Sequence, residues 1–144
     1  MTTKRIRTVD RTFSRAFINY TPPEPLTVSQ WAEKHRVLSR ESSAEAGPWR
    51  NARTPYMVEP MDAFNDPKVR EIAIVAPSQV GKSEQELNMI GYIIDQDPGS
   101  TLYVQPNLDD AKKFSRLRIA PMLRDCPRLR NKVSEIKSRD SGNT

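Results

Sequence analysis

Eight consecutive residues, 76–83, carry groups suited to holding a polyphosphate. Their sequence, APSQVGKS, fits the pattern G-x-x-x-x-G-K-[ST], except that Ala76 stands where the first glycine is usual. In such a loop several backbone N–H groups point at the anion, and Gly81 lets the backbone approach it closely. The candidate nucleotide-binding residues are therefore Ala76, Pro77, Ser78, Gln79, Val80, Gly81, Lys82 and Ser83.

The last two residues of the loop have distinct roles in this chemistry. Lys82 would reach the β- and γ-phosphates as a point charge, and the Ser83 hydroxyl would ligate Mg²⁺. A helix that starts at Gly81 or Lys82 would add the positive end of its dipole. The pattern predicts a nucleoside triphosphate and Mg²⁺ as ligands.

The loop needs a strand before it and a helix after it. Residues 72–76 form a short apolar run that predicts a buried strand over 71–76, and helical spacing of apolar residues predicts a helix to about Asp95. A second strand is expected at 101–105. It is followed by a helix capped by Asn107, with one face formed by Leu108, Ala111, Phe114 and Leu117. The order β-α-β-α favours an α/β fold with parallel strands.

The residues before the loop predict mainly helices. A basic amphipathic helix is expected within 1–20, followed by a Pro-rich linker at 21–25. A capping box at Thr27 predicts a helix over 28–36 with Trp31 inward. Residues 39–53 are expected to be a loop anchored by Trp49, and Thr54–Pro55 predicts a capped helix start, with Pro60 kinking a helix that reaches Phe64.

Composition narrows the class of protein. The chain has 144 residues, a net charge of +5 and 36% hydrophobic residues, which suits one small domain. It has neither an apolar run of about 20 residues nor a signal peptide, so no membrane association and a cytoplasmic location are expected. Cys126 and His35 are each the single residue of their type, and we interpret them as a passive thiol and an ordinary helix residue.

Basic residues gather at both ends of the chain. Residues 1–20 carry five Lys or Arg against one Asp, and residues 108–139 carry ten against four acidic residues. Clusters of this size suit binding to a phosphate backbone, and they equally suit a solvated helix face. The charge pattern leaves both interpretations open.

No second acidic site follows the loop. Nucleotide hydrolases of this kind hold Mg²⁺ and orient water with an Asp or Glu at the end of another apolar strand. Asp95 ends an apolar run, but it lies inside the helix predicted to follow the loop. No catalytic residue is assigned. Because two strands make a poor parallel sheet, we interpret the chain as the first part of a longer protein.

Several separated motifs resemble the large terminase subunit of lambda-type tailed phages, the GpA family. They extend from about Leu26 to the end of the chain: WAEKH at 31–35, GPW at 47–49, TPY at 54–56, VAPSQVGKS at 75–83, TLYVQP at 101–106, and FSR and PMLRDCP at 114–116 and 121–127. The resemblance implies an incomplete P-loop ATPase domain at 26–144, preceded by the basic segment and linker at 1–25.

The resemblance also implies ligands and partners. In the family an ATP-driven motor moves double-stranded DNA into an empty procapsid through its portal, in the host cytoplasm, and an endonuclease domain follows. The extreme N-terminus contacts the small terminase subunit. Tyr56 would lie near the adenine, but Met57 stands where related motors often have a glutamine that reads the adenine edge.

Other interpretations remain open at this point. The loop also suits another P-loop ATPase, such as a superfamily 2 helicase. The chain could instead be a non-catalytic interaction fragment that uses the face of Phe13 and Phe17, or a prophage remnant. Alone, it is expected to bind nucleotide weakly without turnover.

Overall fold

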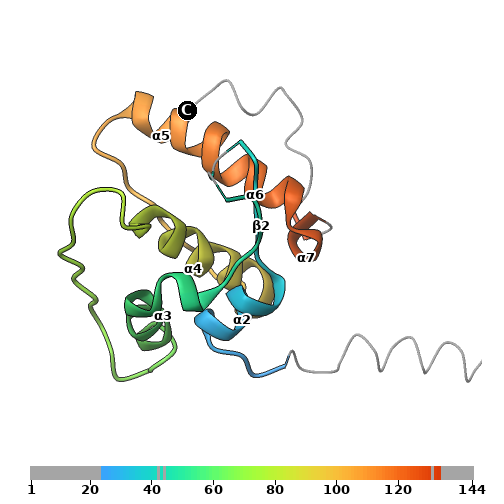
Figure 1. Ribbon diagram of the computed structural model, residues 1–144. Helices are drawn as coiled ribbons and strands as arrows, with labels where there is room; N and C mark the ends of the chain where they lie inside the picture. The colour runs from blue at the N-terminus through green and yellow to red at the C-terminus, as the bar shows by residue number, and fades with distance from the viewer. Residues whose placement is uncertain (1–23, 42, 44, 131, 134–144) are drawn as a thin grey trace, which may run out of the picture.

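The helix that follows the loop, α4, lies at the centre of the fold (Figure 1). The computed structural model describes residues 24–41, 43, 45–130 and 132–133, so the basic helix predicted within 1–20 lies outside the described residues. The described elements are α2 (Val28–His35), β1 (Val37–Leu38), β2 (Gly47–Pro48), η1 (Asn51–Arg53), η2 (Pro55–Met57), α3 (Val58–Ala63), α4 (Lys82–Gln96), α5 (Leu108–Phe114), η3 (Ser115–Ile119), α6 (Ala120–Asp125) and α7 (Pro127–Arg130).

The predicted start of α2 is confirmed. Thr27 accepts a hydrogen bond from the Gln30 N–H at 3.3 Å, and the Gln30 side chain accepts one from the Thr27 N–H at 3.1 Å. This capping box satisfies two N–H groups at the helix start that would otherwise have no partner. Trp31 points inward, as expected, and is fully buried.

The segment after α2 contains a short ribbon that the sequence did not predict. β1 and β2 pair antiparallel, with Val37 opposite Pro48 and Leu38 opposite Gly47. Trp49 follows β2 and is buried, which confirms its predicted role as an anchor. The expected helix of 54–64 forms as η2 followed by α3, but Thr54 makes no capping bond, and its buried hydroxyl has no hydrogen-bond partner.

The prediction of strands at 71–76 and 101–105 is wrong for this structure. Both segments lack strand structure, so the expected parallel sheet is not formed among the described residues. A strand needs backbone hydrogen bonds to a neighbour, and neither segment lies in a ladder. Their apolar side chains are correspondingly exposed: Val75 fully, Leu102 by 88% and Val104 by 74%.

The helices α5, η3 and α6 form one continuous rod (Figure 1). Asn107 caps α5 by accepting from the Asp110 N–H at 2.8 Å, as predicted. Pro121 is of a residue type that usually ends a helix, yet α5 continues through the π-helical η3 into α6, which contains Pro121. Proline cannot donate to the preceding turn and crowds its carbonyl, which accounts for the wider turn. Leu108 and Leu117, two residues of the face predicted for this helix, are 58% and 63% exposed.

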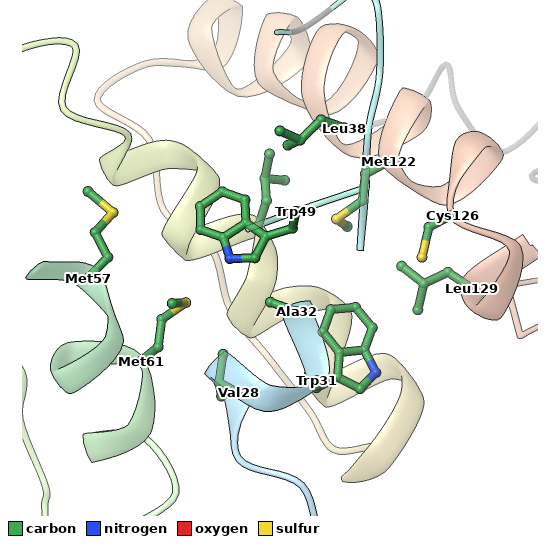
Figure 2. Packing of buried hydrophobic residues seen from close by; sticks show 11 residues of the cluster. Val28, Trp31, Ala32, Leu38, Trp49, Met57, Met61, Met122, Cys126 and Leu129 are labelled. Atoms are coloured by element: carbon green, nitrogen blue, oxygen red, sulfur yellow. The ribbon is translucent and has the colours of Figure 1, made fainter. Parts of the chain in front are cut away.

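Side chains from most of the elements pack around α4 and form the core. Figure 2 shows ten of them labelled, from α2, the ribbon, η2 and α3, and the α6–α7 region. The buried apolar residues are Val28, Trp31, Ala32, Leu38, Trp49, Met57, Met61, Leu87, Met122, Cys126 and Leu129. Cys126 fits the expectation of a passive thiol: it is buried, and its Sγ donates to the His35 carbonyl at 3.0 Å.

Two features of α4 fix its contact with α2. Gly91 lies directly against the Trp31 ring, and a Cβ there would come within 2.4 Å of Trp31 Cη2. One turn later, buried Asp95 accepts a hydrogen bond from Trp31 Nε1 at 2.8 Å and pairs with Arg128 and Lys132 at 3.0 and 2.6 Å. The Trp31 indole therefore packs closely against Gly91, and one turn later it donates a hydrogen bond to the Asp95 carboxylate.

Replacing Gly91 with alanine is expected to destabilise the fold. Overpacking costs about 1–3 kcal/mol, and we expect the upper part of this range because the indole is rigid. That exceeds the roughly 1 kcal/mol that Ala gains over Gly in a helix. The midpoint of urea unfolding should fall.

Gly99→Ala is the matched control for that substitution. Its new Cβ would meet nothing closer than the Asp97 carbonyl at 3.9 Å, so the change should stay within about 0.5 kcal/mol. Equal destabilisation by the two substitutions would contradict the proposed contact between α2 and α4.

Asp95→Asn is expected to lower stability and change its pH dependence. Burial by itself raises the pKa of the Asp95 carboxyl, but hydrogen bonds from Lys132, Trp31 and Arg128 outweigh it and hold that pKa well below its usual range. The stabilisation is therefore present above the unfolded-state pKa of about 3.9 and is lost as the pH falls toward the folded-state pKa.

Wild type and Asp95→Asn should differ in how the free energy of unfolding, measured with urea, changes between pH 7 and pH 3. At pH 7 the free energy of unfolding of Asp95→Asn should be about 3 kcal/mol below that of wild type. This is the lower end of the range for removing one partner of a buried ion pair, because Arg128 and Lys132 are partly exposed. Wild type should lose more stability than the variant between pH 5 and pH 3. Parallel pH profiles would show that Asp95 is not the group responsible.

Candidate functional site

The loop of residues 76–83 joins an extended segment to the start of α4. Gly81 is the residue immediately before the helix and has φ +91°, a left-handed conformation that favours glycine. Gln79 is also left-handed, with φ +63°, which is uncommon for a residue with a side chain. The backbone thus turns sharply into the helix, as a loop wrapped around a ligand requires.

The start of α4 differs from the starts of α2 and α5. Those two helices begin with side-chain caps, from Thr27 and Asn107, whereas α4 has no side-chain cap hydrogen bond. The first N–H groups of a helix have no partner within it, and they carry the positive end of the dipole. A 15-residue helix with this uncapped end suits an anionic ligand.

Lys82 lies folded back across the loop. Its Nζ donates hydrogen bonds to the carbonyls of Ala76 at 2.6 Å and Pro77 at 3.1 Å. The ammonium group therefore lies beside the first residues of the loop, six positions earlier in the chain.

Tyr56 joins the loop to the helical N-terminal part. Its hydroxyl donates to the Val80 carbonyl at 3.1 Å, and the side chain is 59% exposed. Beside it lies an open hollow of about 360 Å³, whose lining includes Trp49, Tyr56, Val80 and Gly81. The exposed ring and this hollow offer a flat surface and space next to the loop.

Met57, the residue after Tyr56, does not line this hollow. It is 2% exposed and lies in the core, and its Cε is 3.4 Å from the point where a Cβ on Gly81 would be. Met57 therefore packs against Gly81 from the side of the core.

A charged cluster beside the loop was missed by sequence reasoning. Glu84, in the first turn of α4, pairs with Arg36 at 2.9 Å and with Arg118 at 3.3 Å. The Arg36 side chain is 1% exposed. Burial lowers the pKa of its guanidinium, while the charge of Glu84 opposes that shift. Nothing in the local sequence marks residues so far apart as partners.

The site offers a modest set of metal ligands. Ser83 is exposed at the start of α4, where its hydroxyl suits one coordination position of Mg²⁺. Within the part of the chain that the structure describes, no group of three or more His, Cys, Asp or Glu residues could hold a metal ion.

Comparison with known proteins identifies the family. Residues 43–144 match the family described as "Phage terminase large subunit gpA, ATPase domain". This chain belongs to the GpA family of phage terminase large subunits. The match confirms the resemblance inferred from the separated motifs and favours it over a superfamily 2 helicase.

Two curated relatives are similar to the chain. The terminase large subunit of Escherichia phage lambda is 32% identical over 107 residues, and that of Enterobacteria phage P21 is 31% identical over 107 residues. Each alignment covers 74% of this chain but 16% of the relative. The chain therefore spans only about a sixth of the relatives' length, and no solved structure matches it.

Among the described residues, no helix is both long enough and apolar enough to cross a bilayer.

Tyr56→Phe should loosen the loop without changing the fold. An exposed hydrogen bond contributes about 1 kcal/mol, so the loss should accelerate amide exchange in residues 78–81 about fivefold. The urea midpoint should hardly move, because the ring remains. Hydrogen exchange followed by NMR measures both effects.

Tyr92→Phe is the control for this substitution, since it removes the same hydroxyl from a partly buried position on α4. It should leave exchange in the loop unchanged. Loop exchange that responds equally to both substitutions, or to neither, would show that the Tyr56 hydroxyl does not anchor the loop.

Proposed function

We propose that this chain is the N-terminal part of the ATPase domain of a DNA-packaging motor, and that it binds Mg-ATP through residues 76–83. The observation that carries the proposal is the uncapped start of α4 behind left-handed Gly81, with Lys82 bent over the loop. Membership of the terminase family supports ATP as the nucleotide. The ATPase portion would occupy residues 26–144, and residues 1–25 would form a separate basic segment.

Each part of the nucleotide has a candidate partner in this arrangement. The N–H groups from Ser78 to Ser83 and the dipole of α4 would hold the phosphates. Lys82 would exchange the Ala76 and Pro77 carbonyls for the β- and γ-phosphate oxygens. Ser83 would ligate Mg²⁺, which neutralises phosphate charge when bound. The base would stack on Tyr56, in the hollow beside Val80.

The proposed fold includes a parallel sheet of the P-loop type. Segments 71–76 and 101–105 would be two of its strands once they have neighbours. Their exposed apolar side chains, Val75, Leu102 and Val104, support this because such residues are normally buried in parallel sheets.

The proposed partners follow from the family. Double-stranded DNA would be moved into the procapsid through the portal, in the host cytoplasm, and the N-terminal segment would contact the small terminase subunit. A full-length protein would add the acidic hydrolytic group and an endonuclease domain. The 144-residue chain alone is therefore proposed to bind ATP without sustained hydrolysis.

Lys82→Ala tests the nucleotide site. Charge-assisted hydrogen bonds contribute about 1.5–3 kcal/mol, so the Kd for Mg-ATP should rise at least about tenfold. Isothermal titration calorimetry on the full chain measures this. Lys112→Ala, which removes an exposed lysine on α5, should leave the Kd unchanged.

A second variant and an activity assay complete the test. Ser83→Ala should reduce the difference between the affinities measured with Mg²⁺ and with EDTA. Absence of ATP binding by wild type, or equal binding by wild type and Lys82→Ala, would refute the site. Steady, Lys82-dependent hydrolysis would instead refute the claim that this chain lacks turnover.

A further inference from the structure

Three separate elements meet at the carboxylate of Glu84, directly after the phosphate loop. Arg36, the C-cap residue directly after α2, contributes Nη2 at 2.9 Å from Oε2. Arg118, from η3, contributes Nη1 at 3.3 Å from Oε1. We call these three residues the Glu84 cluster. Each carboxylate oxygen thus faces one guanidinium, and Glu84 is next to Ser83 in the chain.

Arg36 makes this position rigid. Its side chain is 1% exposed, and its buried Nε has no hydrogen-bond partner. A buried cation is costly unless an anion faces it, so the Glu84 carboxylate is fixed where Arg36 requires it. Glu84 is 15% exposed and its own N–H donates to the Gly81 carbonyl at 3.0 Å. The buried guanidinium therefore constrains the turn that contains Gly81, Lys82 and Ser83.

Arg118 extends the constraint to the C-terminal rod. It lies in the π-helical turn before Pro121, where the backbone is wider than in an α-helix. The Arg118 side chain is 40% exposed, so it responds more easily to its surroundings than Arg36 does. A shift of the rod would move one of the two guanidinium groups that hold Glu84.

The charge of the cluster explains why an acidic residue is tolerated here. Glu84 lies in the wall of the same hollow as Tyr56 and Gly81, where a bare carboxylate would repel a triphosphate. Two guanidinium groups against one carboxylate leave one net positive charge. The cluster is therefore compatible with an anion in the loop.

We propose that Glu84 is a positioning residue for the phosphate loop and that Arg118 acts through it. The affinity of the loop for nucleotide then depends on the placement of the α5–η3–α6 rod, although Arg118 need not touch the nucleotide. This inference rests on the proposed function, and it deepens it by naming the contact that couples the nucleotide site to another part of the fold.

Substitutions at Glu84 separate positioning from simple repulsion. If Glu84 were only an acidic neighbour of the phosphates, Glu84→Gln would tighten Mg-ATP binding. If it positions the loop, the same substitution weakens binding even though it removes a negative charge. Because Glu84→Gln also leaves Arg36 buried without its anion, the decisive variants are at the more exposed Arg118.

The experiment compares three variants of the full chain. Arg118→Met removes one guanidinium from Glu84. Arg118→Lys keeps the positive charge and should rescue the effect. Arg116→Met removes the same charge from an exposed position on the same π-helical turn. Arg118→Met should raise the Kd for Mg-ATP at least about fivefold, the lower end of typical coupling between sites, while the other two stay within about twofold.

Hydrogen exchange without nucleotide gives an independent measurement. The amides of Glu84 and Gln85, which donate to the Gly81 carbonyl, should exchange at least about fivefold faster in Arg118→Met than in Arg116→Met. Equal effects of the two methionine substitutions on these amides, or no effect of either, would overturn the inference.

The two proposals fail in different ways. If wild type does not bind ATP, but Arg118→Met still accelerates amide exchange more than Arg116→Met does, the nucleotide site is refuted. Glu84 would then remain the residue that positions the loop. Normal, Lys82-dependent ATP binding that is equally affected by Arg118→Met and Arg116→Met would refute the positioning role alone.

Discussion

The packing of Trp31 against α4 is the contact on which the rest of this structure depends. Gly91 has no side chain to hold α2 and α4 apart, and Asp95 accepts a hydrogen bond from the Trp31 indole N–H. Close approach alone would allow the helices to slide, but the hydrogen bond at Asp95 fixes their register. Arg128 and Lys132 then bring the C-terminal residues to the same carboxylate. One helix is thereby fixed relative to both halves of the chain.

The two ends of α4 are held by different means. At its C-terminal end, buried Asp95 accepts hydrogen bonds from Trp31 in α2, from Arg128 in α7 and from Lys132 beyond α7. At its N-terminal end, Glu84 pairs with Arg36 and Arg118 from the side, and the N–H groups of the first turn are left without a side-chain cap. Fixing the helix from the side leaves its N-terminus available to an anion. A side-chain cap would hold the same turn but would compete with a phosphate for the N–H groups.

Local patterns in the sequence predicted much of the helical structure and most of the candidate site. The capping box at Thr27, the Asn107 cap and the long helix after Gly81 formed as expected because each depends on residues within a few positions of one another. The strands at 71–76 and 101–105 did not form, since a strand also needs a neighbour that local sequence does not supply. The π-helical turn before Pro121 was missed for a related reason: packing carried the helix past a residue that usually ends one.

Local sequence specified the chemical groups of residues 76–83: a glycine that can turn into a helix, a lysine and a hydroxyl at fixed spacing. It also determined the family, because the motifs that carry the resemblance are local. The side chains around that loop, in contrast, are brought together by the packing of distant segments. Arg36, Glu84 and Arg118 are separated by dozens of residues, and nothing in their local sequence indicates that they meet. Their pairing depends on how α2 and the C-terminal rod pack against α4, because burial, rather than spacing along the chain, creates the need for a counter-charge.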